Sequence, residues 1–137
     1  PNNPDKFGYQ VWVNGNEDIE GEEPRLLLSG LDQSIDEVEQ MVHSLGGLFI
    51  PAHIDRPSFG LFSQLGFIPP LLVCDAMEVS ANATAAFLAS TKVRDKYRII
   101  SSSDAHYPNQ IGSHFTTFEM EMETASFEEL RKLRIKQ

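Results

Sequence analysis

The sequence has little cysteine and no long apolar run, and each scarcity excludes classes of protein. Among its 137 residues there is one cysteine, Cys74, which excludes an internal disulfide and a metal site built from several cysteines. No apolar run approaches the ~20 residues that a membrane-spanning helix needs. The opening residues, Pro1-Asn-Asn-Pro, resemble neither a signal peptide nor a transit peptide. These features predict a soluble, cytoplasmic protein.

Positive charge is scarce as well. The chain carries 11 Lys and Arg residues against 20 Asp and Glu residues, a formal net charge of −9. Without a basic stripe to displace counterions, strong binding to nucleic acid is not expected. An acidic protein still binds a phosphate ester when divalent cations lie between the two. The acidic charge therefore argues against strong nucleic-acid binding, but it is compatible with a phosphate ester bound through divalent cations.

Length and hydrophobic periodicity predict the organisation of the chain. The length suits a single domain over residues 1–137, with an irregular or hairpin region over 1–33 and a βα core over 34–137. Expected strands lie at 9–13, 26–28, 47–50, 76–79, from Tyr97 onward and at 114–120, and expected helices begin at Ser34 and span 59–65, 82–95 and 126–135. From residue 34 onward, this alternation predicts an α/β fold with parallel strands and helical crossovers.

Polar side chains follow two of the predicted strands. His53 comes after the strand at 47–50, and Asp104 and His106 come after the strand that begins at Tyr97. Asp104 and His106 are two residues apart, so in extended geometry both project to one side. Because binding groups gather at the carboxyl ends of parallel strands, these residues predict a mixed oxygen and nitrogen site for a divalent cation.

Several polar residues of the predicted βα core also allow interpretations in which they bind no ligand. Asp104 and His106 also suit a polar turn, in which Asp104 caps backbone amides and His106 is exposed. Glu78 lies between apolar neighbours in the strand at 76–79, where a carboxylate either needs a partner or a metal, or faces water from an edge. His43 lies off the apolar face of the helix that begins at Ser34, and is expected to be exposed and uninvolved.

Three segments of the sequence form recognisable motifs: Pro-Ala-His-Ile-Asp-Arg-Pro at 51–57, Asp-Ala-Met-Glu-Val at 75–79 and Ile-Ser-Ser-Ser-Asp-Ala-His-Tyr-Pro at 100–108. They resemble motifs of the PHP family, the polymerase and histidinol phosphatase domain. The resemblance spans residues 34–135 and is most specific in the Ser-Asp-Ala-His block. It implies a distorted (β/α)7 barrel of the TIM-barrel-like kind. It also implies up to three divalent metals, manganese, zinc or iron, that hydrolyse phosphate esters.

The resemblance also implies roles for individual residues. By the resemblance, His53, Asp104 and His106 would be metal ligands. From its own position between apolar residues, Glu78 could lie beside them and support them. Arg56 could hold a substrate phosphate, because a guanidinium pairs well with phosphate oxygens. The implied substrate is a phosphorylated small molecule or a nucleotide.

The sequence departs from the family at its first motif, because none of its four histidines forms a His-x-His pair. We therefore expect the chain to be the carboxyl-terminal part of a longer PHP protein. The barrel would lack its amino-terminal strands, and the chain alone would have little or no activity. An open sheet edge would favour self-association. The alternatives are a non-catalytic PHP-like scaffold or interaction module, and an anion-binding domain that uses Ser101–Ser103 as donors.

Overall fold

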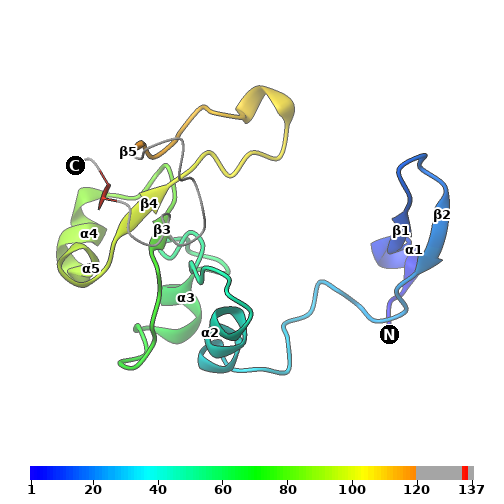
Figure 1. Cartoon of the computed structure of the whole chain (residues 1–137), viewed down its shortest axis with the longest axis horizontal. Coiled ribbons are helices and arrows are strands. Elements are labelled where there is room, and N and C mark those ends of the chain that lie inside the picture. Colours follow the sequence, from blue (N-terminus) through cyan, green and yellow to red (C-terminus); the bar gives the residue numbers. More distant parts are fainter. Residues whose placement is uncertain (120–133, 136–137) are drawn as a thin grey trace. The chain divides into compact units, whose positions relative to one another are not determined.

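A computed structural model describes residues 1–119 and 134–135 (Figure 1). The chain divides into two compact units, Pro1–Ser34 and Ile35–Gln137. Within the part of the chain that the structure describes, no helix is both long enough and apolar enough to cross a bilayer. The residues predicted to carry the site all belong to the second unit.

The first unit is a short helix followed by a hairpin. Helix α1 (Pro4–Phe7) precedes strands β1 (Val11–Val13) and β2 (Ile19–Glu22), which pair antiparallel. Trp12 lies opposite Gly21, whose missing side chain leaves room for the indole. The strand expected at 26–28 is wrong, since those residues form a turn that the amide of Ser29 closes by donating to the carbonyl of Leu26.

The helices of the second unit are short. They are α2 (Ile35–Ser44), α3 (Leu61–Leu65), α4 (Ala85–Thr91), α5 (Val93–Lys96) and the 3₁₀ helix η1 (Pro108–Gln110). The single helix predicted over 82–95 is wrong. It is divided at Lys92, which adopts a left-handed φ of 51° that no continuous α-helix can accommodate.

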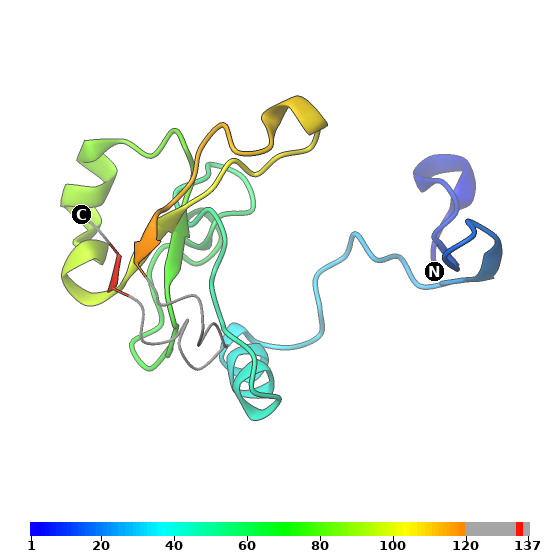
Figure 2. The same cartoon turned by 45° about the horizontal axis from the view of Figure 1, so that its top comes forward.

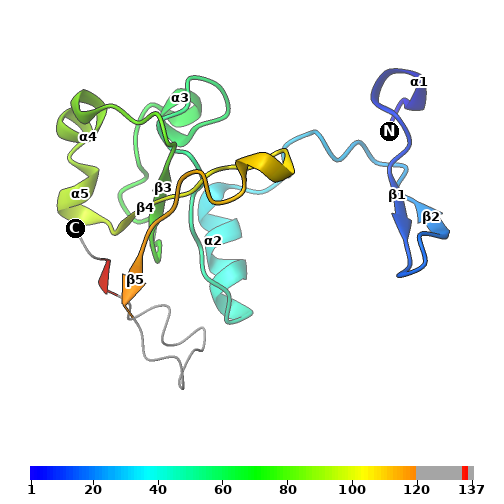
Figure 3. The same cartoon turned by 90° about the horizontal axis from the view of Figure 1, so that it is seen from above.

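Two parallel strands lie at the centre of the second unit. Strand β3 (Met77–Val79) pairs with β4 (Ile99–Ser101), so that Glu78 lies opposite Ile100. Helices α4 and α5 lie on one side of the pair, and α2 lies on the other (Figure 3). This arrangement is α/β, as the alternating pattern predicts. The barrel stays a prediction.

A third segment runs beside β3 without forming a regular strand. The amides of Asp75 and Glu78 donate to the carbonyls of Phe49 and Pro51 at 3.0 and 2.9 Å, and the amide of Ile54 donates to the carbonyl of Glu78 at 2.9 Å. Both segments advance in the same direction along this ladder. The strand expected at 47–50 is irregular because Pro51 has no N–H to donate.

The chain leaves β4 through η1 and then returns beside it (Figure 2). The Thr116 hydroxyl accepts from the amide of Ser101 and donates to its carbonyl. Strand β5 (Phe118–Glu119) then pairs antiparallel with β6 (Arg134–Ile135). Most of the helix predicted over 126–135 lies outside the described residues, but its end is wrong, since residues 134 and 135 form a strand.

The core of the second unit gathers around β3. Its buried side chains are Ile54, Leu61, Met77, Val79 and Val93. They come from the loop before α3, from α3 itself, from β3 and from α5. Because Met77 and Val79 alternate with Glu78 along the strand, burial of the first two turns the carboxylate of Glu78 toward the opposite face. The core thus fixes the direction in which β3 presents its one charged residue.

His43 does not have the exposed position that the sequence suggests. Its Nδ1 lies 2.5 Å from Glu39 Oε1 in the same helix, and its Nε2 lies 2.9 Å from Asp75 Oδ2. The same Asp75 oxygen accepts from the amide of Phe49 at 2.8 Å. The imidazole therefore connects α2 to the segments that lead into Pro51 and β3.

This network predicts a pH-dependent stability. The hydrogen bond to Asp75 raises the pKa of His43, the bond to Glu39 acts in the same direction, and burial opposes both. Burial also raises the pKa of the neighbouring Cys74 thiol to about 11, so the thiol stays uncharged. Because the folded-state pKa of His43 is raised, its contribution is fully present below its ordinary value of 6.5 and is lost as pH rises through the raised value.

We expect His43→Gln to lower the free energy of unfolding more at about pH 6 than at about pH 9. Urea unfolding followed by circular dichroism at both pH values measures the difference. His114→Gln is the matched control, because His114 is exposed. A loss in His43→Gln that is the same at both pH values would show that the charge of the imidazole does not contribute.

Candidate functional site

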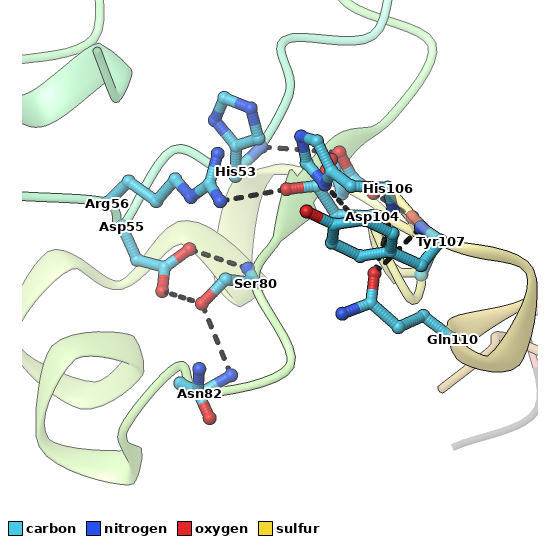
Figure 4. A network of polar contacts seen from close by, with 11 residues as sticks. His53, Asp55, Arg56, Ser80, Asn82, Asp104, His106, Tyr107 and Gln110 are labelled. Carbon is cyan, nitrogen blue, oxygen red and sulfur yellow. Dashed lines mark hydrogen bonds and ion pairs between the residues drawn. The ribbon is translucent and has the colours of Figure 1, made fainter. Parts of the chain in front are cut away.

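The carboxyl ends of the parallel segments open into a cleft of about 580 Å³. Three loops form it: the one that follows Pro51, the one that follows β3 at Ser80 and the one that follows β4 at Ser102. Figure 4 shows the polar side chains that these loops bring together. The cleft therefore lies where binding groups of a parallel sheet are expected.

Asp104 and His106 both line this cleft, and Arg56 lies with them. Asp104 Oδ2 is 2.9 Å from Arg56 Nη2, and the two side chains are 41% and 43% exposed. His106 Nδ1 lies 2.8 Å from the carbonyl oxygen of Asp104, which leaves Nε2 as its ligand atom. The structure thus brings together two of the predicted ligands and the predicted phosphate-binding residue.

The turn that carries these residues is closed by Gln110. Its Oε1 accepts from the amides of His106 and Tyr107 at 2.8 and 3.1 Å. Asp104 is not needed for that capping role, and its carboxylate faces Arg56 across the cleft (Figure 4). Asp104 has a left-handed φ of 47°, so extended geometry does not continue past β4.

His53 occupies a different position from the other two predicted ligands. It lines a neighbouring pocket together with Ile35, Phe59 and Leu61, and its φ of 32° is also left-handed. Its Nδ1 is buried and has no hydrogen-bond partner in the part of the chain that the structure describes. A buried, unpaired imidazole nitrogen is costly, and a ligand would satisfy it.

Glu78 has a hydrogen-bond partner in each of the two loops that carry the predicted ligands. Its Oε2 accepts from the amide of His53 at 3.3 Å, and its Oε1 accepts from the Ser102 hydroxyl. A second carboxylate, Asp55, accepts from the amide and the hydroxyl of Ser80 at 2.7 and 2.6 Å. The open question about Glu78 is thereby answered: it is a half-buried, hydrogen-bonded carboxylate rather than one that faces water.

Asp55 and Gln110 are cleft residues that the sequence interpretation passed over, whereas it considered Ser102 only as a donor of the alternative anion-binding domain. Asp55 follows His53 at a spacing of two and Ser102 precedes Asp104 at the same spacing, so both follow predicted strands closely enough to be noticed. Gln110 gives no such signal. It lies four residues after His106, and only the η1 turn returns its amide to the loop.

The donor atoms of the cleft and of the nearby His53 are of the kinds that bind a divalent cation, but the part of the chain that the structure describes does not arrange three of them around one point. Carboxylate oxygen and imidazole nitrogen suit manganese, iron or zinc, and the unpaired His53 Nδ1 is the atom that most needs such a partner. Within residues 1–119 and 134–135, however, no three histidine, cysteine or acidic side chains converge on one point. Within those residues, the three predicted ligands therefore do not form one metal-binding group, and His53 lines a different pocket from Asp104 and His106.

Comparison with known proteins agrees with the family that the motifs resemble. Residues 80–133 match the family model described as PHP-associated. The resemblance to PHP proteins is confirmed. This PHP-associated segment contains Ser80, Ser102, Asp104 and His106 of the cleft, whereas His53 lies before it.

One curated relative extends the similarity beyond the PHP-associated segment. The chain is 29% identical over 97 residues to "Uncharacterized protein YqxK" of Bacillus subtilis (strain 168). The aligned region covers 67% of this chain and 24% of the relative. The chain thus spans about a quarter of that protein's length. No solved structure matches the chain.

Proposed function

We propose that this chain is the carboxyl-terminal part of a metal-dependent phosphoesterase of the PHP type. One observation carries the proposal: a guanidinium, a carboxylate and an imidazole share a strand-end cleft that extends into a PHP-associated segment. When bound, a divalent cation would polarise the phosphoryl oxygens and lower the pKa of the attacking water. The chain alone is expected to have little activity, because its donors do not form one cage of three.

The residues of the cleft have distinct roles in this proposal. Arg56 binds the phosphate ester, because its fork of N–H donors matches phosphoryl oxygens and its contact with Asp104 uses one nitrogen. Asp104 and His106 offer an oxygen and a nitrogen to the cation, and His53 offers its unpaired Nδ1. The substrate class is a phosphorylated small molecule or a nucleotide.

A non-catalytic, PHP-like module is the second candidate. The observation in its favour is the ion pair between Asp104 and Arg56, in which a predicted ligand and the predicted phosphate-binding residue satisfy each other. In such a module the loops would keep their structure without holding a cation.

Hydrolysis of p-nitrophenyl phosphate with added manganese tests the proposal. It is measured on this chain and on the longer protein that the proposal implies, beside His53→Ala and Asp104→Ala. We expect the longer protein to be active, and both substitutions and a chelator to lower its rate. His114→Ala, at an exposed histidine outside the cleft residues, is the matched control and should leave the rate unchanged.

Three results would count against the phosphoesterase. Activity that survives both His53→Ala and Asp104→Ala would place the chemistry elsewhere. Absence of manganese-dependent hydrolysis in the longer protein would favour the non-catalytic module. Binding of inorganic phosphate that ignores the chelator would favour the anion-binding domain, with donors among Ser101–Ser103.

A further inference from the structure

Glu78 connects the two loops that carry the predicted ligands. Its backbone amide donates to the carbonyl of Pro51 and its carbonyl accepts from the amide of Ile54, each at 2.9 Å. Its carboxylate accepts from the His53 amide through Oε2 and from the Ser102 hydroxyl through Oε1. All four polar groups of this one residue are therefore engaged by loop residues at the strand ends.

The loops that Glu78 connects are strained at the residues of interest. His53 and Asp104 have φ values of 32° and 47°, in the left-handed region that residues other than glycine adopt at a cost. Such conformations persist where the surroundings hold them. Glu78 accepts from the amide of His53 itself, and it accepts from Ser102, two residues before Asp104.

We infer that Glu78 is a positioning residue, which fixes the spacing between His53 and the Asp104–His106 pair. Its place in β3 makes this possible, because Met77 and Val79 on either side are anchored in the core and hold the strand in place. The carboxylate acts through the two loops and does not itself contact the substrate. The inference rests on the proposed function for its catalytic consequence, but the connection between the loops can be tested without it.

The first experiment follows the connection directly. In an NMR spectrum of the chain, Ser102→Ala is expected to shift the amide resonance of His53 and to speed its hydrogen exchange, because the carboxylate of Glu78 loses one of its two side-chain restraints. Ser90→Ala is the matched control. Its hydroxyl donates to a helical carbonyl, that of Phe87 in α4, and it should leave the His53 amide unchanged. An unchanged His53 amide in Ser102→Ala would overturn the inference.

The second experiment uses substitutions of Glu78 itself. A glutamine can still accept from the His53 amide and can donate to the Ser102 hydroxyl, so Glu78→Gln should keep the loops in place. Glu78→Ala removes both contacts and is expected to weaken manganese binding about 10- to 100-fold, as loss of a ligand's supporting partner typically does. Isothermal titration with manganese alone measures the affinity. Equal losses in the two variants would show that the negative charge matters rather than the positioning.

The two experiments separate this inference from the proposed function. If the unaltered longer protein neither binds manganese nor hydrolyses a phosphomonoester, the proposed function fails, and the His53 amide in Ser102→Ala alone decides whether Glu78 connects the loops. If manganese binds and the His53 amide does not respond, the proposed function stands and the positioning role is wrong. Ser102→Ala also keeps the test decisive where Glu78→Ala fails to fold.

Discussion

Gly60→Ala is expected to destabilise the second unit and to disturb the loop that carries His53 and Arg56. An added Cβ would lie 2.5 Å from the carbonyl oxygen of Arg56, 2.9 Å from its nitrogen and 3.0 Å from the carbonyl oxygen of His53. All three are backbone atoms, so relief requires the whole turn to move. Overpacking of this kind typically costs about 1–3 kcal/mol, which exceeds the ~0.4–1 kcal/mol that alanine gains by restricting the unfolded chain.

Urea unfolding measures the loss of stability, and the chemical shifts of the Arg56 and His53 amides report the displaced loop. Gly30→Ala is the matched control, because its Cβ would meet no atom within 4 Å. An equal unfolding free energy for the two variants would mean that the 53–56 turn adapts without cost. The approach of residue 60 to this turn would then not be what holds Arg56 near Asp104.

The sequence predicts the strongly patterned parts of this fold. The capping pattern at Ser34 and the apolar spacing after it predict α2, and the apolar runs predict β3 and β4. The break between α4 and α5 carries no such signal. It occurs at Lys92, a good helix former, rather than at a glycine or a proline. Local propensity cannot foretell a break of this kind, which depends on how the helices pack.

His43 shows a second limit of a sequence pattern. Helical periodicity compares the residue only with its own helix, where it lies off the apolar face. Its second partner, Asp75, lies 32 residues away and reaches it only after the chain has returned beside Phe49. A polar residue off the apolar stripe is therefore exposed only when no other segment covers it.

The candidate site was predictable to the extent that its residues are close in sequence. Asp104 and His106 stay together in one cleft, as their spacing predicts, although a contact between His106 and the Asp104 carbonyl holds them rather than extended geometry. The separate position of His53 was not predictable. It depends on a left-handed backbone conformation at His53 and on the direction of the loop after Pro51, and the pattern of residue types predicts neither of them.

Met77→Ala is expected to have the largest effect on stability. Met77 is 0% exposed and packs in the cluster with Ile54, Leu61 and Val93, so truncation removes apolar contacts and leaves a cavity. Substitutions of this kind cost about 2–5 kcal/mol, a large share of the ~5–15 kcal/mol by which a domain is stable.

Met41→Ala is the matched control for this loss, since the same side chain is 51% exposed on α2. A surface change of this kind usually stays within about 0.5 kcal/mol. Denaturant unfolding of the two variants therefore separates the effect of burial from the effect of residue type.

Met77 also precedes Glu78 in β3, so a loosened strand should weaken the contact between Glu78 and the His53 amide as well. Similar losses at positions 41 and 77 would mean that the cluster around β3 does not hold the strand in place.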